Sequence, residues 1–276
     1  MRRNKHYKAI VLSSRSFGEH NRYISLLTQE GIIDAAVYGA RKPSSRFAPA
    51  SQIGAAGDYY LYYNPVKDNY KLTDTAGTKL LASSVLPVSA SFIFFSELVL
   101  STHAAGQPKE VWKLAIWLWR RLFIGLEEDG TFVAKSGGAD ITLSPIKTYN
   151  LHRLTMFLLY TALHYMEIMG LLPDWQTCSH CTKSLAKQPA IWTETGLLCP
   201  ACSGTSAEYT HGRITLTAAQ RTILSDIAEG RQNPDTHPLS SPDLYSATLN
   251  LLLEKTERIA ERRIKSLIFL RQCLSL

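Results

Sequence analysis

Short runs of β-branched and aromatic residues fill the first third of the chain, and turn-forming residues separate them. Three such runs occupy residues 7–14, 23–28 and 32–39, and two more flank a turn at 64–69 within the segment 58–75. This spacing predicts about five short antiparallel strands in roughly 75 residues. A small β-barrel of the OB type is the architecture that fits this strand count.

A helical period replaces the strand pattern after about residue 84. Helices are expected where apolar positions recur at three- and four-residue intervals, at residues 92–104, 109–128, 151–170, 217–230 and 243–274. The last segment forms one long helix or two shorter ones, and the glycine-rich polar segment 129–147 is predicted to be a loop. The chain therefore reads as an α+β multi-domain protein, with a barrel at 1–80 and a mostly helical domain at 81–276.

Two Cys-x-x-Cys pairs lie seventeen residues apart, and they comprise Cys178, Cys181, Cys199 and Cys202. Each pair can supply two thiolates of a tetrahedral Zn²⁺ site, and the spacing is typical of structural zinc modules. We expect one structural zinc ion in a small ribbon-like module at about 174–208. Because four thiolates leave no open position for water, this zinc is not expected to be catalytic.

Other interpretations of the cysteines fit less well. Two unrelated pairs of buried or redox cysteines are the alternative to zinc, but an intracellular chain favours metal ligands. A zinc deaminase needs an upstream H-x-E, whereas His164 and Glu167 are spaced H-x-x-E. His180 lies between two ligands and is expected to be exposed, and the remaining Cys273 is expected to be a small buried apolar residue.

The charge of the chain is concentrated in its N-terminal third. The net charge is +7 with a pI of about 9.1, and residues 1–80 contribute +6 of it. This balance favours an anionic partner, either nucleic acid or a membrane surface. Because no secretory signal is present and the most apolar stretch, 86–100, is short and interrupted by Glu97, we expect a soluble, cytoplasmic protein.

Motifs of nucleotide-binding and hydrolytic enzymes are absent from the sequence. It contains no phosphate-binding loop of the G-x-x-x-x-G-K-[ST] type, no G-x-S-x-G elbow and no G-x-G-x-x-G fingerprint. No pairing of a nucleophile with a base is evident either. These absences favour a binding protein over an enzyme, and an enzyme with an unrecognised site in the helical domain is the weaker alternative.

A basic segment with aromatic ends, YGARKPSSRF, spans residues 38–47. Its cations Arg41, Lys42 and Arg46 can bind phosphates, and aromatic rings can stack bases. On a barrel this segment is expected to be an exposed loop after the third strand. The alternative is a solvated basic loop without a ligand.

The same region resembles the N-terminal signature of the RecO family of bacterial DNA-repair and recombination mediators. The matching residues are Gly18, Glu19, Arg22, Thr28, Gly31, the run from Gly39 to Pro43, and the run from Ser45 to Phe47. Residues 169–181 and 262–270 are also similar to the family. Two features depart from its pattern, because His20-Asn21 stands where an acidic residue is usual and the strand at 59–63 is more aromatic than expected.

The resemblance implies an OB-fold, a helical domain and a zinc module, with no catalytic residue. It implies binding of single- and double-stranded DNA, annealing of complementary strands, and help in loading recombinase onto single strands coated with SSB protein. The implied partners are DNA, RecR and the acidic C-terminal tail of SSB. The alternative function is that of an RNA-binding or transcription-associated zinc-ribbon protein.

Two sets of contact residues follow from this interpretation. DNA phosphates are expected at Arg22, Arg41, Lys42 and Arg46, with the basic C-terminal helix as the alternative surface through Arg258, Arg262, Arg263 and Lys265. The SSB tail needs an apolar pocket with a basic rim, which Trp117, Arg120 and Arg121 could form on one helix. The alternative is that the tryptophans of this helix belong to the core and its arginines are solvated.

Overall fold

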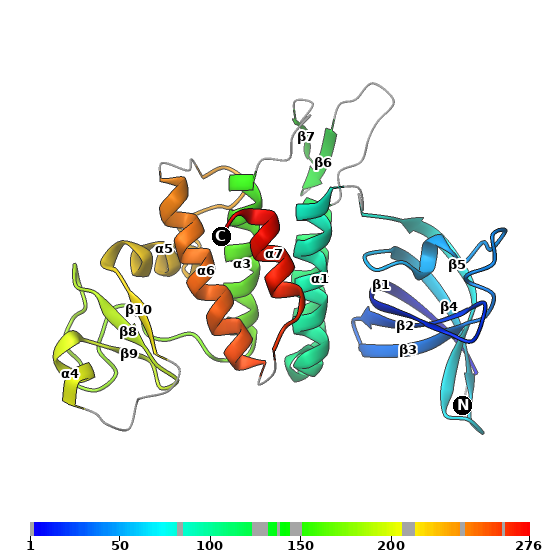
Figure 1. Ribbon diagram of the computed structural model, residues 1–276, viewed down its shortest axis with the longest axis horizontal. Coiled ribbons are helices and arrows are strands. Elements are labelled where there is room, and N and C mark those ends of the chain that lie inside the picture. The colour runs from blue at the N-terminus through cyan, green and yellow to red at the C-terminus, as the bar shows by residue number, and fades with distance from the viewer. Residues whose placement is uncertain are drawn as a thin grey trace. The chain divides into compact units, whose positions relative to one another are not determined.

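The computed structural model describes residues 3–81, 85–122, 132–136, 139–143, 151–205, 213–237, 241–260 and 263–276 (Figure 1). Its contacts divide the chain into two compact units. The first contains Met1–Tyr149 with Ile264–Cys273, and the second contains Asn150–Arg263 with Leu274–Leu276. The division expected from the sequence, into a barrel domain at 1–80 and a helical domain at 81–276, stays a prediction.

The first unit begins with a closed barrel of five strands in the order β1-β2-β3-β5-β4. The strands are β1 (Asn4–Phe17), β2 (Asn21–Thr28), β3 (Gly31–Val37), β4 (Ala56–Asn64) and β5 (Asn69–Lys79). All neighbours are antiparallel except β3 and β5, which run parallel. An odd number of alternating strands cannot close with antiparallel pairs alone, so one parallel pairing completes the predicted barrel.

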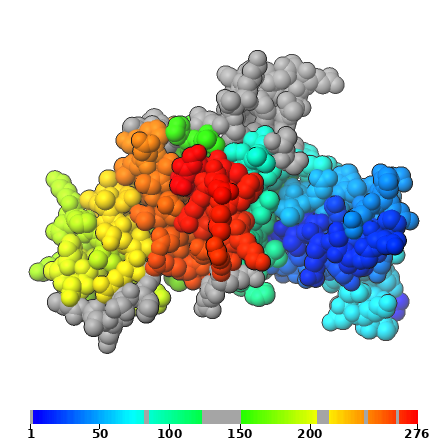
Figure 2. All heavy atoms as spheres, in the orientation of Figure 1, coloured from blue at the N-terminus to red at the C-terminus, as the bar shows by residue number. Residues whose placement is uncertain are grey.

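Alternating side chains of the strands fill the barrel interior. The largest fully buried residues there include Tyr59 and Leu61 of β4 and Leu72 of β5. The buried hydroxyl of Tyr59 donates a hydrogen bond to the carbonyl oxygen of Ala50 at 2.8 Å, so this polar atom is satisfied. In the space-filling view the blue and cyan barrel residues pack into a continuous surface (Figure 2).

Helices follow the barrel within the same unit: α1 (Leu86–Ser101), α2 (Pro108–Leu122) and, near the C-terminus, α7 (Ser266–Leu274). The indole Nε1 of Trp119 in α2 donates to the carbonyl of Gly54 in the barrel at 2.7 Å. The Glu97 carboxylate of α1 accepts from the backbone N–H groups of Lys265 and Ser266. It thereby caps the N-terminus of α7, where orphan N–H groups need acceptors.

One expectation is corrected in the segment 129–147, which was predicted to be a loop. Its described residues form a hairpin of β6 (Phe132–Ser136) and β7 (Ala139–Leu143). Phe132 pairs with Leu143 and Ala134 pairs with Ile141, so the segment carries alternating apolar positions typical of strands, which the surrounding glycines and polar residues obscured. The sequence between these strands is Gly-Gly, which is itself a hairpin signal.

The second unit packs α3 (Leu151–Ile168), α5 (Ala218–Ala228) and α6 (Pro242–Ile259) with the cysteine segment. That segment contains β8 (Ala190–Trp192), β9 (Leu197–Leu198) and α4 (Pro200–Thr205), and β8 also pairs with β10 (Ile214–Leu216). Thr217 caps α5 in a capping box with Gln220. The C-terminal segment forms two helices, α6 and α7. No helix among the described residues is both long and apolar enough to cross a membrane.

Candidate metal centre and nucleic-acid interface

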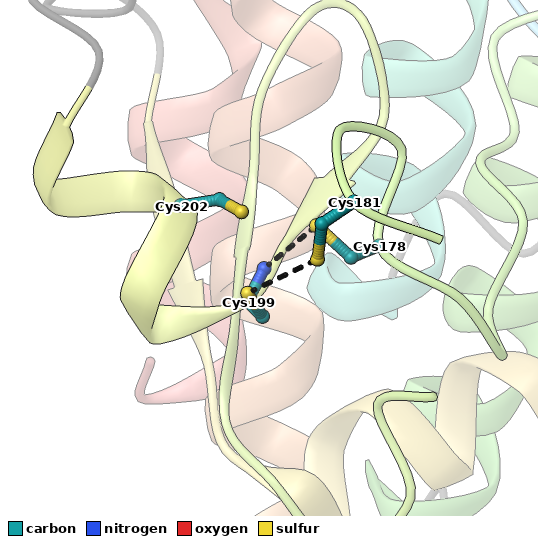
Figure 3. A group of neighbouring side chains, drawn as sticks. All are labelled: Cys178, Cys181, Cys199 and Cys202. Atoms are coloured by element: carbon teal, nitrogen blue, oxygen red, sulfur yellow. Dashed lines mark hydrogen bonds between the residues drawn. The ribbon is translucent and has the colours of Figure 1, made fainter. Parts of the chain in front are cut away.

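The four cysteines of the two Cys-x-x-Cys pairs come together in the second unit. Cys178 and Cys181 lie on a tight turn, Cys199 directly follows β9, and Cys202 lies in α4 (Figure 3). Their four Sγ atoms lie within 4.8 Å of one another, and Cys181 and Cys199 approach to 3.8 Å. The predicted convergence of these residues on one point is therefore confirmed.

Backbone hydrogen bonds hold the first pair against the second. The backbone N–H of Cys178 donates to the Lys183 carbonyl at 2.9 Å, which closes the turn. The N–H of Ser179 donates to the Leu197 carbonyl at 2.8 Å, which places the turn against β9. Gly196 permits this approach, because a Cβ there would lie 3.0 Å from the Cβ of Ser179 and its φ is +132°.

The surroundings of Cys178 favour its thiolate form. Burial opposes ionisation, but backbone N–H groups of Cys181, Cys199 and His180 donate to its sulfur and lower its pKa to about 6. In contrast, interactions with the sulfurs of Cys181 and Cys199 raise the pKa of Cys202 to about 12. Without a cation the cluster therefore cannot ionise completely at neutral pH, whereas a metal ion would remove this barrier.

The donor set can hold a metal ion and restricts its identity. Four sulfur ligands in compact geometry are typical of Zn²⁺ and of iron–sulfur sites, and unsuited to Mg²⁺ or Ca²⁺. His180 is exposed, as expected, but its Nδ1 lies 3.6 Å from the sulfur of Cys202. This contact depends on how α4 packs against the turn, so the spacing of His180 and Cys202 in the sequence does not indicate it.

Two buried cations attach the cysteine segment to the helices of the second unit. The guanidinium of Arg221 in α5 donates to the carbonyls of Trp175 and Leu185, both at 2.6 Å. The ammonium of Lys255 in α6 donates to the Thr193 carbonyl at 3.1 Å. Burial lowers the pKa of both groups. Sequence reasoning missed these residues, because a lone cation on a helix is usually solvated.

The basic loop after β3 presents three of the four predicted DNA-contacting cations to solvent, namely Arg41, Lys42 and Arg46, and the first two have no protein partner for their charge within the described residues. Arg41 and Lys42 are exposed, and backbone N–H groups of the loop donate to the carbonyls of His20 and Gly39. Neither cation has an ion pair among the residues that the structure describes. Their charges therefore remain available to an anionic ligand.

The other two predicted cations are engaged with the barrel itself. Arg46 bonds to the carbonyl of Thr73 at 3.2 Å and pairs with the Asp74 carboxylate at 3.4 Å. Arg22 donates to the carbonyl and hydroxyl oxygens of Ser51 at 3.3 and 3.2 Å. The structure thus brings Arg41 and Lys42 together but partly satisfies Arg46 and Arg22 with protein acceptors.

An aromatic strip that the sequence did not reveal crosses the barrel close to this loop. It consists of Phe17, Tyr23 and Tyr38, with the cations Arg15 and Lys71 at its two ends. These residues come from three strands and the loop after β3; the pairing of β1, β2 and β3 brings the three rings and Arg15 together, and the β3–β5 pairing adds Lys71. The one signal in the sequence was the position of Tyr38 at the start of the basic segment.

The predicted partner-binding residues lie at the end of α2. The Arg121 guanidinium stacks on the ring of Trp117 at 3.9 Å and donates to its carbonyl. Trp117 is half-buried and Arg120 is exposed, whereas Trp112 and Trp119 belong to the core. In the alternative basic surface, Arg258 pairs with Glu254, Arg263 and Lys265 are exposed, and Arg262 lies outside the described residues.

Together these features define an OB-type barrel protein with a helical domain and a cysteine cluster that can hold zinc. Residues 1–79 match the model of the family described as "Recombination protein O N terminal". The N-terminal domain is thus a RecO N-terminal domain, and the matches to known proteins support membership of the chain in the RecO family, as the resemblance predicted.

Two curated relatives share this assignment. The DNA repair protein RecO of Acaryochloris marina (strain MBIC 11017) is 32% identical over 112 residues, which cover 39% of this chain and 38% of that protein. The DNA repair protein RecO of Shouchella clausii (strain KSM-K16) is 43% identical over 60 residues, or 21% of this chain and 23% of that protein. The chain therefore spans less than two fifths of either relative in these matches.

Proposed function

We propose that the chain is a non-enzymatic DNA-binding protein of recombinational DNA repair. It binds single- and double-stranded DNA, anneals complementary strands and helps to load recombinase onto single strands coated with SSB protein. The observation that carries this proposal is the exposure of Arg41 and Lys42, without an ion pair among the described residues, on a loop of a RecO N-terminal barrel. The net charge of +6 in residues 1–80 supports it.

The mechanism follows from contact with phosphates rather than with bases. Guanidinium and ammonium groups bind phosphate oxygens in any sequence, so this contact carries no base identity. Two complementary strands repel each other, and cations that neutralise their phosphates lower that repulsion. Phosphate contact therefore explains sequence-independent binding and annealing together, with Arg22 and Arg46 contributing from the barrel edge.

Replacement of Arg41 and Lys42 together with alanine tests this mechanism. Loss of two phosphate contacts should lower the log–log slope of single-strand affinity against salt by about 1.4, at about 0.7 per phosphate. Annealing of complementary oligonucleotides should slow in parallel. Fluorescence anisotropy over a salt series measures the slope, and the melting temperature should change little because both side chains are exposed.

A variant with equal charge loss elsewhere provides the control. Lys67 and Lys109 are exposed residues of the first unit outside the basic loop, and their replacement with alanine should change the slope much less. An unaltered slope and annealing rate in the folded Arg41/Lys42 variant would place DNA on another surface. If the wild-type protein prefers RNA and does not speed DNA annealing, the alternative RNA-binding function gains support.

The metal proposed for the cysteine cluster is one structural Zn²⁺ per chain. Cys178, Cys181, Cys199 and Cys202 would hold it, because four thiolates in a compact cluster match its preference for tetrahedral sulfur ligands. Zinc bound there would stabilise the module at 174–208 and carry out no reaction. This role agrees with a binding protein that needs no catalytic residue.

The partners RecR and the SSB C-terminal tail belong to the same proposal. The half-buried Trp117 with Arg120 and Arg121 offers an apolar surface with a basic rim, which suits a short acidic tail ending in an aromatic residue. In the proposed organisation, residues 1–80 bind DNA and residues 81–276 provide the helical domain and zinc module. Such a protein would act in the bacterial cytoplasm at the nucleoid.

A further inference from the structure

The side chain of Tyr38 is half exposed on the barrel surface. It retains 50% of its accessible area, which makes it one of the more exposed large apolar residues of the described chain. Its neighbours hold it in place, because the edge of Phe17 meets its ring at a centroid distance of 6.0 Å and 77°. Phe17 in turn stacks on Tyr23 at 4.0 Å. Tyr38 is therefore the exposed end of a packed series of three rings.

Both ends of this aromatic strip carry a cation. The ammonium of Lys71 lies 5.4 Å from the ring centroid of Tyr38, and the guanidinium of Arg15 lies 5.5 Å from that of Tyr23. Within the described parts of the chain, neither cation forms an ion pair with a carboxylate. The strip thus combines exposed aromatic surface with two cations that form no described ion pair, although Asp34 and Asp68 line the hollow beside Arg15.

Shallow hollows flank the strip on the barrel surface. One of about 540 Å³ is lined by Tyr38 and Lys42 together with the turn at residues 19–21. Another of about 440 Å³ is lined by Arg15, Tyr23 and residues of β3 and the β4–β5 hairpin. Both volumes lie within the range of roughly 300–1,000 Å³ that small-ligand sites have. Lys42 therefore shares a hollow with the exposed ring of Tyr38.

The turn that carries Tyr38 is also held firmly. The backbone N–H of Gly39 donates to the Asn21 side-chain oxygen at 2.9 Å, and that of Arg41 donates to the His20 carbonyl at 2.9 Å. These bonds attach the loop to the turn between β1 and β2 on the far side of the hollow. A ligand that enters need not order the loop, so little conformational entropy opposes binding.

From this arrangement we infer that Tyr38 stacks an unpaired base of single-stranded DNA, with Lys42 and Lys71 at the flanking phosphates. A base presents a flat π-face to an aromatic ring, and this contact is tolerant of sequence. Bases in a duplex are already stacked and paired, so the site selects single strands over double strands. The inference rests on the proposed DNA-binding function, and deepens it by separating base contact from phosphate contact.

Replacement Tyr38→Ala isolates the base contact. It should weaken binding of a single-stranded oligonucleotide by roughly tenfold, which is within the effect of one stacked base. Binding of a duplex of equal length should not change, and neither should the salt slope, because no phosphate contact is lost. Tyr38→Phe keeps the ring and should bind as the wild type does.

Two controls separate stacking from other effects. Tyr60 is 40% exposed on the same barrel but outside the strip, where its ring stacks on His6, and Tyr60→Ala should not alter single-strand affinity. An oligonucleotide with abasic sites keeps its phosphates and lacks bases. It should bind the wild type about tenfold more weakly than normal DNA, and Tyr38→Ala should cause no further loss with it.

The outcomes distinguish this inference from the proposed function. Equal losses of single- and double-strand affinity in Tyr38→Ala, or a loss that persists with abasic DNA, would overturn base stacking. A loss of single-strand affinity that occurs with normal DNA and not with abasic DNA would support base stacking. This result would stand even if the Arg41/Lys42 variant leaves the salt slope unchanged and so contradicts phosphate binding by the basic loop. Absence of DNA binding by the wild type would contradict both proposals.

Discussion

At the scale of single residues, buried cations fix the cysteine segment to its supporting helices. Arg221 is 5% exposed, and no described carboxylate pairs with it. Its guanidinium instead provides donors to two carbonyls of the cysteine segment, at Trp175 and Leu185. The Trp175 carbonyl lies in irregular backbone outside any sheet, and Arg221 supplies its donor. The Leu185 carbonyl also accepts from the backbone N–H of Gln188 at 3.0 Å, so the forked guanidinium joins two parts of the cysteine segment.

Arg221→Met tests this role. The substitution keeps an apolar stem but removes the Arg221 donor from the Trp175 carbonyl, whereas the Leu185 carbonyl still accepts from the backbone N–H of Gln188. An unpaired buried polar group costs about 1–3 kcal/mol, so we expect the free energy of unfolding to fall by about that amount, measured by urea unfolding of the metal-loaded protein. Thr222→Ala alters an exposed neighbour on the same helix and should change it by less than about 0.5 kcal/mol. Equal stability of the two variants would show that Arg221 does not clamp the segment.

At the scale of elements, helix α2 divides its three tryptophans between core and surface. Trp112 and Trp119 are buried, and Trp119 also bonds to the barrel through its indole N–H. Trp117 is half-buried beneath the Arg121 guanidinium. The helical period places it on a different face from Trp119, because two residues along a helix correspond to about 200° of rotation. Trp117 therefore lies apart from the two buried tryptophans, next to the cations Arg120 and Arg121.

Charge reversal by Arg120→Glu and Arg121→Glu should weaken binding of an SSB-tail peptide at least tenfold. The acidic peptide would meet two negative charges where it now meets two positive ones, and like charges at an interface are strongly unfavourable. Isothermal titration calorimetry measures this affinity. Lys109→Glu with Lys113→Glu makes the same change on the first turns of α2, and it should have less than about a twofold effect if the pocket is local. Unchanged affinity in the arginine variant would place the tail elsewhere.

At the scale of the whole molecule, the two compact units separate the proposed DNA surface from the metal module. The barrel lies in the first unit, and all four cysteines lie in the second. The chain returns to the first unit at its end, where Glu97 caps α7. The loss of one unit's structure need not remove the other's core, because each has its own buried residues.

Cys199→Ser should therefore abolish metal binding and leave DNA binding intact. Zinc content should fall from one ion per chain to near zero, because three sulfur ligands bind it far more weakly, and the segment 174–208 should become sensitive to protease. Structural zinc contributes about 10–16 kcal/mol in apparent terms, so the module should unfold. The barrel should still bind DNA with wild-type affinity.

Cys273→Ser provides the matched control for this experiment. Cys273 is the remaining cysteine of the chain and lies in α7, outside the cluster. Its replacement should leave the zinc content and the protease resistance unchanged. A fully folded wild-type protein without zinc, by elemental analysis, would contradict the structural role of the metal.

Local signals in the sequence were enough to determine much of this protein. Short runs of β-branched and aromatic residues, separated by turn formers, predicted the five barrel strands, and the three- to four-residue period predicted the main helices. The spacing of the cysteine pairs predicted their convergence, because each Cys-x-x-Cys turn is a local structure that presents two sulfurs in one direction.

Only the tertiary structure decided which distant groups meet. Pairing of β1, β2 and β3 brought Phe17, Tyr23 and Tyr38 into one strip, and the parallel pairing of β3 with β5 added Lys71. Arg46 pairs with Asp74 of β5, whereas Arg41 has no ion pair within the described parts of the chain, although both are cations of one short loop. Residue type and spacing determine local conformation, but the partner of a side chain depends on segments that the chain brings together from far along its sequence.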